Sequence, residues 1–163
     1  MKLFKWFRKS PQLREEDALR LATLPVYIAS EQPLDQQRFV VVDLETSGLN
    51  TLKDKILSIG AVTIDQSAIA LGQQFSCTLR RTNHAVSESV LIHQIPPSEV
   101  AAGVRPENAL LSFMEYVGSS PLLAFHASFD QRMLVREMDD AFAYPLRHAF
   151  YDVAEIAPLL YPE

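Results

Sequence analysis

Leucine spacing predicts a helix near the start of the chain, and strand-like patterns follow it. The leucines from Leu13 to Leu24 fall at positions compatible with one helical face, and Pro25 then ends the pattern. After a polar linker, Phe39–Val42 is a continuous run of β-branched and aromatic residues, typical of a strand buried on both faces. Residues 56–65 and 68–79 are two further predicted strands, and the short polar turn between them indicates a hairpin.

The second half of the chain alternates between helical and strand-like patterns. Its longest predicted helix begins at Pro106 and ends at Gly118. Three consecutive strands followed by strand–helix alternation favour an α/β fold, in which a mixed sheet (a three-strand meander plus further strands) carries helices on both faces. The predicted elements after the meander are helices over 87–95, 97–100, 106–118, 127–138 and 154–161, and strands over 121–125 and 148–153.

Composition excludes several classes of protein. The 163 residues are 48% hydrophobic and 21% charged, which is a globular composition, and the single cysteine, Cys77, excludes a disulfide framework. No apolar stretch approaches the roughly 20 residues of a membrane-spanning helix. We therefore expect a cytoplasmic protein with an N-terminal basic and helical extension with its linker (1–37) and one domain (38–163).

Charge is distributed unevenly along the chain. The net charge is −5, and residues 1–9 contribute +4, which leaves −9 for the rest. The excess acid is unlike a protein that coats DNA, so nucleic acid would be held over a short stretch only. The basic and aromatic segment 1–9 favours a loosely held terminus or a short helix packed on its own domain, and contact with an anionic membrane or a partner protein is the alternative.

Acidic residues follow the two most buried predicted strands. Asp43 and Glu45 are two positions apart, so on a strand both side chains project from one face. Asp130 lies in the first turn of the helix that follows the strand 121–125, where it can approach the other two. Carboxylate oxygens suit Mg²⁺ or Mn²⁺, so the three acids predict a metal site. The alternatives are a solvated strand end for the pair and a helix-dipole partner for Asp130.

Several segments, in order, resemble the motifs of one family. They belong to the DEDD superfamily of 3′–5′ exonucleases, in the group of the DNA polymerase III epsilon proofreading subunit. The resembling segments are VVVDLETSGLN with ILSIGAV, then IHQIPPSEV, LLAFHASFD and FYDVAEIAPLLYP. The resemblance implies a ribonuclease-H-like (RNase H-like) fold and removal of nucleotides from the 3′ ends of single-stranded DNA or RNA, as in proofreading or repair. It also implies a DNA polymerase subunit as a partner.

The resemblance assigns roles to individual residues. Asp43, Glu45 and Asp130 would be catalytic and would hold a two-metal site of Mg²⁺ or Mn²⁺. The substrate-binding residues would be Thr46, Ser47, Gly48, Leu49, His93 and Phe129. His126 and Asp152 are weaker candidates, and Asp152 is expected to have a structural or supporting role.

The resemblance departs from the family pattern at three places. Phe125–His126 stand where the family has His-Asn, and Gln94 replaces a glycine. The third departure is the last motif, a histidine five residues before a fourth carboxylate, which does not occur before Glu163. His148 and Asp152 are four apart and are a less favoured substitute. We therefore expect a C-terminally incomplete part of an active exonuclease. The alternative is a nucleotide-binding or nucleic-acid-binding module with little or no activity.

Overall fold

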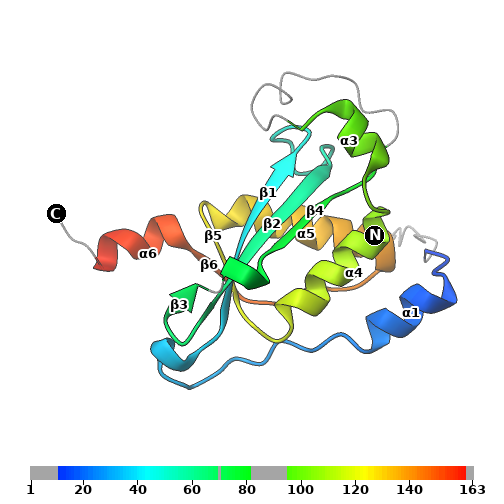
Figure 1. Ribbon diagram of the computed structural model, residues 1–163. Coiled ribbons are helices and arrows are strands. Elements are labelled where there is room, and N and C mark those ends of the chain that lie inside the picture. The colour runs from blue at the N-terminus through cyan, green and yellow to red at the C-terminus, as the bar shows by residue number, and fades with distance from the viewer. Residues whose placement is uncertain (1–10, 70, 82–94, 161–163) are drawn as a thin grey trace, which may run out of the picture.

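A mixed β-sheet flanked by helices forms the centre of the computed structural model, which describes residues 11–69, 71–81 and 95–160 (Figure 1). The predicted α/β class is confirmed. The strands are β1 (Phe39–Thr46), β2 (Ile56–Asp65), β3 (Ala68–Ile69), β4 (Phe75–Thr78), β5 (Leu122–Ala124) and β6 (Phe150–Asp152). Their order is β3-β2-β1-β5-β6, and β4 also pairs with β2. The β1–β2 pair is antiparallel, whereas β5 runs parallel to both β1 and β6.

The helices begin and end largely where sequence signals place them. They are α1 (Glu15–Ala22), α3 (Pro97–Ala102), α4 (Pro106–Val117), α5 (Ala127–Phe142) and α6 (Val153–Leu160). Pro97 and Pro106 occupy first helical positions, where the missing N–H is not needed. Gly118 ends α4 with a φ of +62°, which favours glycine. The helix α5 runs four residues beyond the predicted end, and most of the predicted helix over 87–95 lies outside the described residues.

The predicted continuous strand over 68–79 is wrong in its middle. Two short strands occupy its ends, because β2 pairs Ile64 with Ile69 but Ala61 with Phe75. More residues separate Ile69 from Phe75 than separate Ala61 from Ile64, so an unbroken ladder is impossible. The chain leaves the sheet and forms a 3₁₀ turn at Leu71–Gln73. The hairpin itself is confirmed, and its two turn residues have the positive φ of a tight β-turn.

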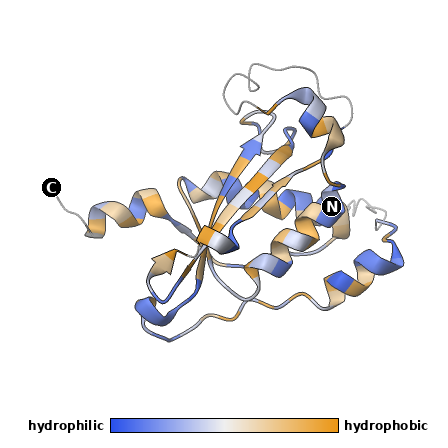
Figure 2. Cartoon of the chain, viewed as in Figure 1, coloured by the Kyte–Doolittle hydropathy of each residue, from blue (hydrophilic) through white to orange (hydrophobic). Residues whose placement is uncertain are grey.

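Alternation along β1 separates the core from the outer face of the sheet. Val40, Val42 and Leu44 are buried, while Val41 is half-buried and Asp43 is exposed. Figure 2 shows hydrophobic residues concentrated on the central strands and hydrophilic ones on α1. The helix α4 precedes β5, α5 connects the parallel neighbours β5 and β6, and the two helices contact each other. This arrangement starts α5 beside the end of β1.

The helix α1 is held against α4 by two ion pairs. Asp17 is 2% exposed and accepts hydrogen bonds of 2.6 and 2.8 Å from the Arg105 guanidinium. Arg20 donates two bonds of 2.7 Å to the Glu115 carboxylate. The segment 1–37 as a separate extension stays a prediction. None of the helices among the residues described above is long and apolar enough to cross a membrane.

Replacement of Asp17 by alanine is expected to destabilise the protein by about 3 kcal/mol, because it leaves the Arg105 guanidinium without its main partner. The Arg105 hydrogen bond, opposed by burial, holds the pKa of Asp17 below its ordinary value. The difference in unfolding free energy between wild type and Asp17→Ala should therefore disappear below about pH 4. Urea unfolding measures both effects. Glu15→Ala, an exposed acid of the same helical turn, is the control, and equal stability of the two variants contradicts the prediction.

Candidate active site

The candidate site lies where β1 continues beyond its parallel neighbour. The strand β5 ends at Ala124, and its last pairing with β1 joins Val41 to Leu123. The final residues of β1 therefore extend past β5 without a strand partner on that side. The Asp130 carboxylate, which comes from the first turn of α5, lies there, and the Leu44 backbone acts to lower its pKa.

Two of the predicted carboxylates influence each other at this edge. Asp43 is exposed on β1, whereas Asp130 is 6% exposed. Burial raises the pKa of Asp130 to about 7, and the negative charges of Asp43 and, to a smaller extent, Asp152 add to the shift. Backbone hydrogen bonds oppose the shift without cancelling it. Among the described residues, the charges that act on Asp130 are therefore acidic ones.

The donor chemistry of this edge fits a hard divalent cation. Carboxylate oxygens are the ligands such ions prefer, and a cation would relieve the repulsion between Asp43 and Asp130. Glu45 is half-buried, two residues further along β1. Across the described ranges, however, no group of three or more His, Cys, Asp or Glu side chains is close enough together to hold a metal ion. The metal site of three carboxylates therefore stays a prediction.

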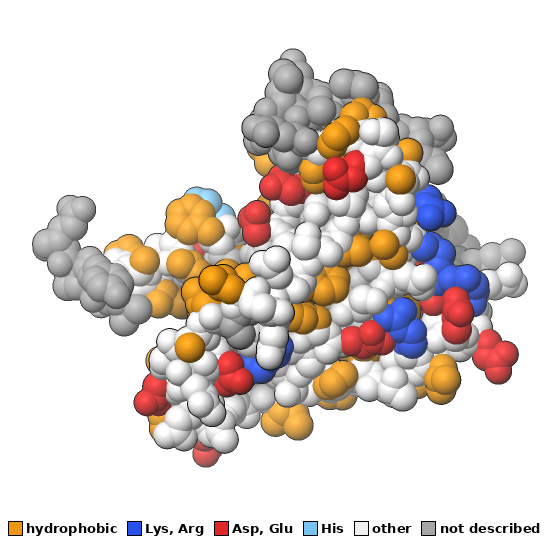
Figure 3. Space-filling view, in the orientation of Figure 1, with side chains coloured by type: hydrophobic (Ala, Val, Ile, Leu, Met, Phe, Trp, Pro, Cys, Tyr) orange, Lys and Arg blue, Asp and Glu red, His pale blue; other side chains and the backbone are white. Residues whose placement is uncertain are grey.

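The surface charge of this region is negative. Figure 3 shows acidic side chains gathered near the upper end of β1, while Lys and Arg side chains lie mainly on the side of α1 and α4. A phosphate group that approaches the end of β1 would be repelled unless cations compensate the charge. The electrostatics therefore agree with the donor chemistry of the edge.

Asp152 holds the start of the helix that carries Asp130. Its two carboxylate oxygens accept the backbone N–H groups of His126 and Ala127, each at 3.0 Å, and that of Ala154 at 2.9 Å. His126 has a φ of +58°, in a region that histidine enters more readily than most residues. One side chain at the end of β6 thus fixes the first residues of both α5 and α6. We infer that Asp152 positions Asp130.

The loop after β1 is organised by its own side chains. The Thr46 hydroxyl donates to the Gly48 carbonyl at 2.8 Å, and the Ser47 hydroxyl donates to Asp54 at 3.1 Å. A Cβ atom on Gly48 would lie 2.5 Å from the Asp54 carboxylate, so any larger residue there would displace that carboxylate. Leu49, by contrast, is 85% exposed. Of the four predicted substrate-binding residues here, three shape the loop and Leu49 presents its side chain to solvent.

Two residues that sequence reasoning missed fasten this loop to α5. The Arg136 guanidinium donates to the carbonyls of Thr51 and Asp54. The neighbouring Glu137 is buried and accepts a 3.0 Å bond from Arg81. A signal was present in the sequence, since Glu137 lies on the apolar stripe of α5 seven residues after Asp130. Charged residues on such a stripe are expected to bind something specific.

The remaining candidates are buried or half-buried in the protein, or lie outside the described residues. Phe129 is half-buried and packs against the core. His93 lies outside the described residues. His148 precedes β6, whereas Asp152 ends it, and the buried His148 ring donates from Nε2 to the Gly118 carbonyl at 2.8 Å. Burial lowers the pKa of His148, which suits a neutral structural residue.

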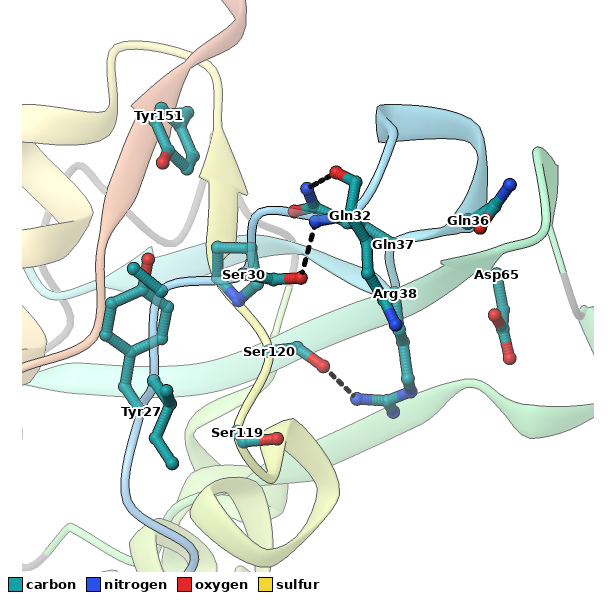
Figure 4. A pocket seen from close by; sticks show the side chains of 13 residues that line it. Tyr27, Ser30, Gln32, Gln36, Gln37, Arg38, Asp65, Ser119, Ser120 and Tyr151 are labelled. Carbon is teal, nitrogen blue, oxygen red and sulfur yellow. Dashed lines mark hydrogen bonds between the residues drawn. The ribbon is translucent and has the colours of Figure 1, made fainter.

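A cavity of about 340 Å³ lies at the other end of the parallel strands, away from the carboxylates (Figure 4). Its polar lining includes Arg38 and Ser120, which are joined by a 2.6 Å hydrogen bond. Arg38 also donates to the carbonyls of Tyr116 and Val117 and to the Thr63 hydroxyl. Because the Arg38 guanidinium is bonded to other groups of the protein, its role here is to connect the strands to the helix α4.

Sequence comparison identifies the family. A family model described as Exonuclease (RNase T) matches residues 40–163. The DNA polymerase III PolC-type protein of Clostridium perfringens is 28% identical over 85% of this chain and 9% of that protein. The DNA polymerase III subunit epsilon of Treponema pallidum is 30% identical over 76% of this chain and 57% of that protein. The chain thus spans less than two thirds of either relative.

Solved structures agree on the fold. Product-bound exonuclease I has a TM-score of 0.65 and 19% identity, and covers 77% of this chain and 32% of that one. E. coli exonuclease I in complex with a dT13 oligonucleotide has a TM-score of 0.65 and 19% identity, and covers 77% of this chain and 30% of that one. At this identity the likeness concerns the fold alone, and it confirms the predicted RNase H-like architecture. Because the family model matches most of the sequence, the chain belongs to the exonuclease family that the model describes.

Proposed function

We propose that the protein is a metal-dependent 3′–5′ exonuclease that removes nucleotides from the ends of single-stranded DNA in proofreading or repair. The observation that carries this proposal is the approach of exposed Asp43 and buried Asp130 at one sheet edge, in a chain of the exonuclease family. DNA is favoured over RNA because relatives are DNA polymerase III proteins and a structural neighbour binds a dT13 oligonucleotide.

The residues of this edge have separate tasks in the proposed reaction. Asp43, Glu45 and Asp130 would hold Mg²⁺ or Mn²⁺, and the bound ions would supply the positive charge that phosphodiester hydrolysis requires. The bonds of Asp152 to the start of α5 would keep Asp130 in place. The exposed Leu49 side chain would pack against the terminal base.

The same comparisons support a replication setting. Relatives of this chain are DNA polymerase III proteins, so we infer a polymerase subunit as a partner and the cytoplasm as the location. The negative charge of residues 10–163 agrees with this setting, since short single-stranded ends are held by base and local backbone contacts rather than by a broad basic surface.

The proposal predicts stepwise shortening of a 5′-labelled single-stranded oligonucleotide by the full-length protein with Mg²⁺ or Mn²⁺, and none with EDTA. Asp43→Ala should reduce the rate at least about 100-fold, because a group that stabilises charge at the reacting phosphate is lost. Glu31→Ala, an exposed acid in the linker, should leave the rate unchanged. Binding of the oligonucleotide without any shortening would contradict the proposal and favour a module that binds but does not cut.

A further inference from the structure

An exposed aromatic pair stands beside the carboxylate edge. Phe125 is 67% exposed in the turn between β5 and α5, and its ring meets the His126 ring edge-on, with centroids 4.5 Å apart. Phe129, four residues later, packs instead against the core. The pair also departs from the His-Asn of the family pattern, so it is a feature of this chain.

The backbone under the pair is fixed. Both backbone N–H groups that follow Phe125, those of His126 and Ala127, donate to the Asp152 carboxylate at 3.0 Å. Asp130 follows in the same turn of α5, so the aromatic pair and the buried acid share one rigid support. A ring that is already ordered loses little freedom when it binds a flat partner. Single exposed hydrophobic residues are common, but an ordered pair at an acidic edge needs a reason.

We infer that Phe125, supported by His126, stacks on a nucleobase of the substrate strand close to the bond that is cut. Every base has an aromatic face, so such a contact holds single-stranded DNA without selecting its sequence. It also adds affinity without positive charge, which suits an edge where acids gather. This inference rests on the proposed function, because it names a second base contact in the same site, in addition to Leu49.

The test places the fluorescent base 2-aminopurine at each of the last three positions of an oligonucleotide whose phosphorothioate linkages resist hydrolysis. With wild-type full-length protein and Mg²⁺, stacking should quench the fluorescence at one of these positions. Phe125→Ala should remove that quenching and weaken binding, measured by anisotropy, about 5- to 100-fold. Phe125→Tyr should retain both, whereas Phe125→Leu, apolar but without a ring, should not. Leu34→Ala, equally exposed but in the linker, is the matched control.

A further comparison separates stacking from other contacts. On an oligonucleotide that is abasic at the quenched position, wild type and Phe125→Ala should bind equally. The inference alone is overturned if Phe125→Ala binds and shortens DNA as well as wild type does. It is also overturned if Phe125→Leu quenches the 2-aminopurine fluorescence as well as Phe125→Tyr does. If wild type binds no oligonucleotide, the proposed function fails and the inference fails with it. Because Phe125 is exposed, its variants should keep the melting temperature of wild type.

Discussion

Replacement of Asp130 by asparagine is expected to stabilise the metal-free protein while it abolishes hydrolysis. The charged carboxylate is buried next to Asp43, and its pKa is raised to about 7 from an ordinary value of 3.8. A shift of this size corresponds to about 4 kcal/mol of destabilisation once the group is ionised. Asparagine keeps the shape without the charge, so we expect a gain of about 2–4 kcal/mol at pH 8. Hydrolysis should fall at least about 100-fold.

The pH dependence of this gain has a definite sign. The folded protein retains a proton on Asp130 that the unfolded chain releases above about pH 4, so wild-type stability falls as pH rises from about 4 to about 7. The asparagine variant lacks this loss, and the difference between the two unfolding free energies should grow across that window. Mg²⁺ should stabilise wild type more than the variant, because only wild type offers the buried charge.

Urea unfolding from pH 4 to pH 8, with and without Mg²⁺, measures these quantities. Asp35→Asn, an exposed acid in the linker, is the control and should change neither stability nor rate. A stability difference between wild type and Asp130→Asn that does not change with pH would show that Asp130 is not a strained charge.

Asp152→Ala is expected to cost about 2–4 kcal/mol of stability and to lower the hydrolysis rate. The substitution leaves three backbone N–H groups, of His126, Ala127 and Ala154, without their acceptor. The start of α5 would then be free to shift and would carry Asp130 away from β1. Unfolding by urea gives the first effect, and the rate at saturating Mg²⁺ gives the second.

Two further variants show whether Asp152 acts through its bonds. Asp152→Asn retains one oxygen acceptor and should lie between wild type and Asp152→Ala in both measurements. Glu155→Ala removes an exposed acid from the first turn of α6 and should match wild type. An Asp152→Ala variant with wild-type stability would refute the assigned positioning role.

Sequence reasoning succeeded where local signals determine the structure. Proline, glycine and polar turn residues, together with periodicity, predict where β2 and α4 begin and end. These ends are Ile56 and Asp65 for β2, and Pro106 and Val117 for α4. The break in the predicted strand 68–79 could not be predicted, because it depends on the number of β2 residues that lie between the two pairings. The last turn of α5, beyond Met138, was missed because polar residues there weaken the apolar pattern.

The candidate site likewise has some contacts that the sequence predicts and others that it does not. The approach of Asp43 and Asp130 could be predicted, because the first follows the buried run Phe39–Val42 and the second follows the neighbouring buried strand β5. The contacts of Arg136 with the loop after β1 could not, because they join residues 82 and 85 positions apart. Asp152 was expected to have a supporting role, but its three backbone bonds became visible only in the fold. The role of His93 stays a prediction.

Arg136 connects two parts of the candidate site. It joins the segment that displays Leu49 to the same α5 helix that carries Asp130. In the proposed reaction, these two parts of the site would be joined before a 3′ end binds. The loss of conformational freedom on association then falls almost entirely on the nucleic acid.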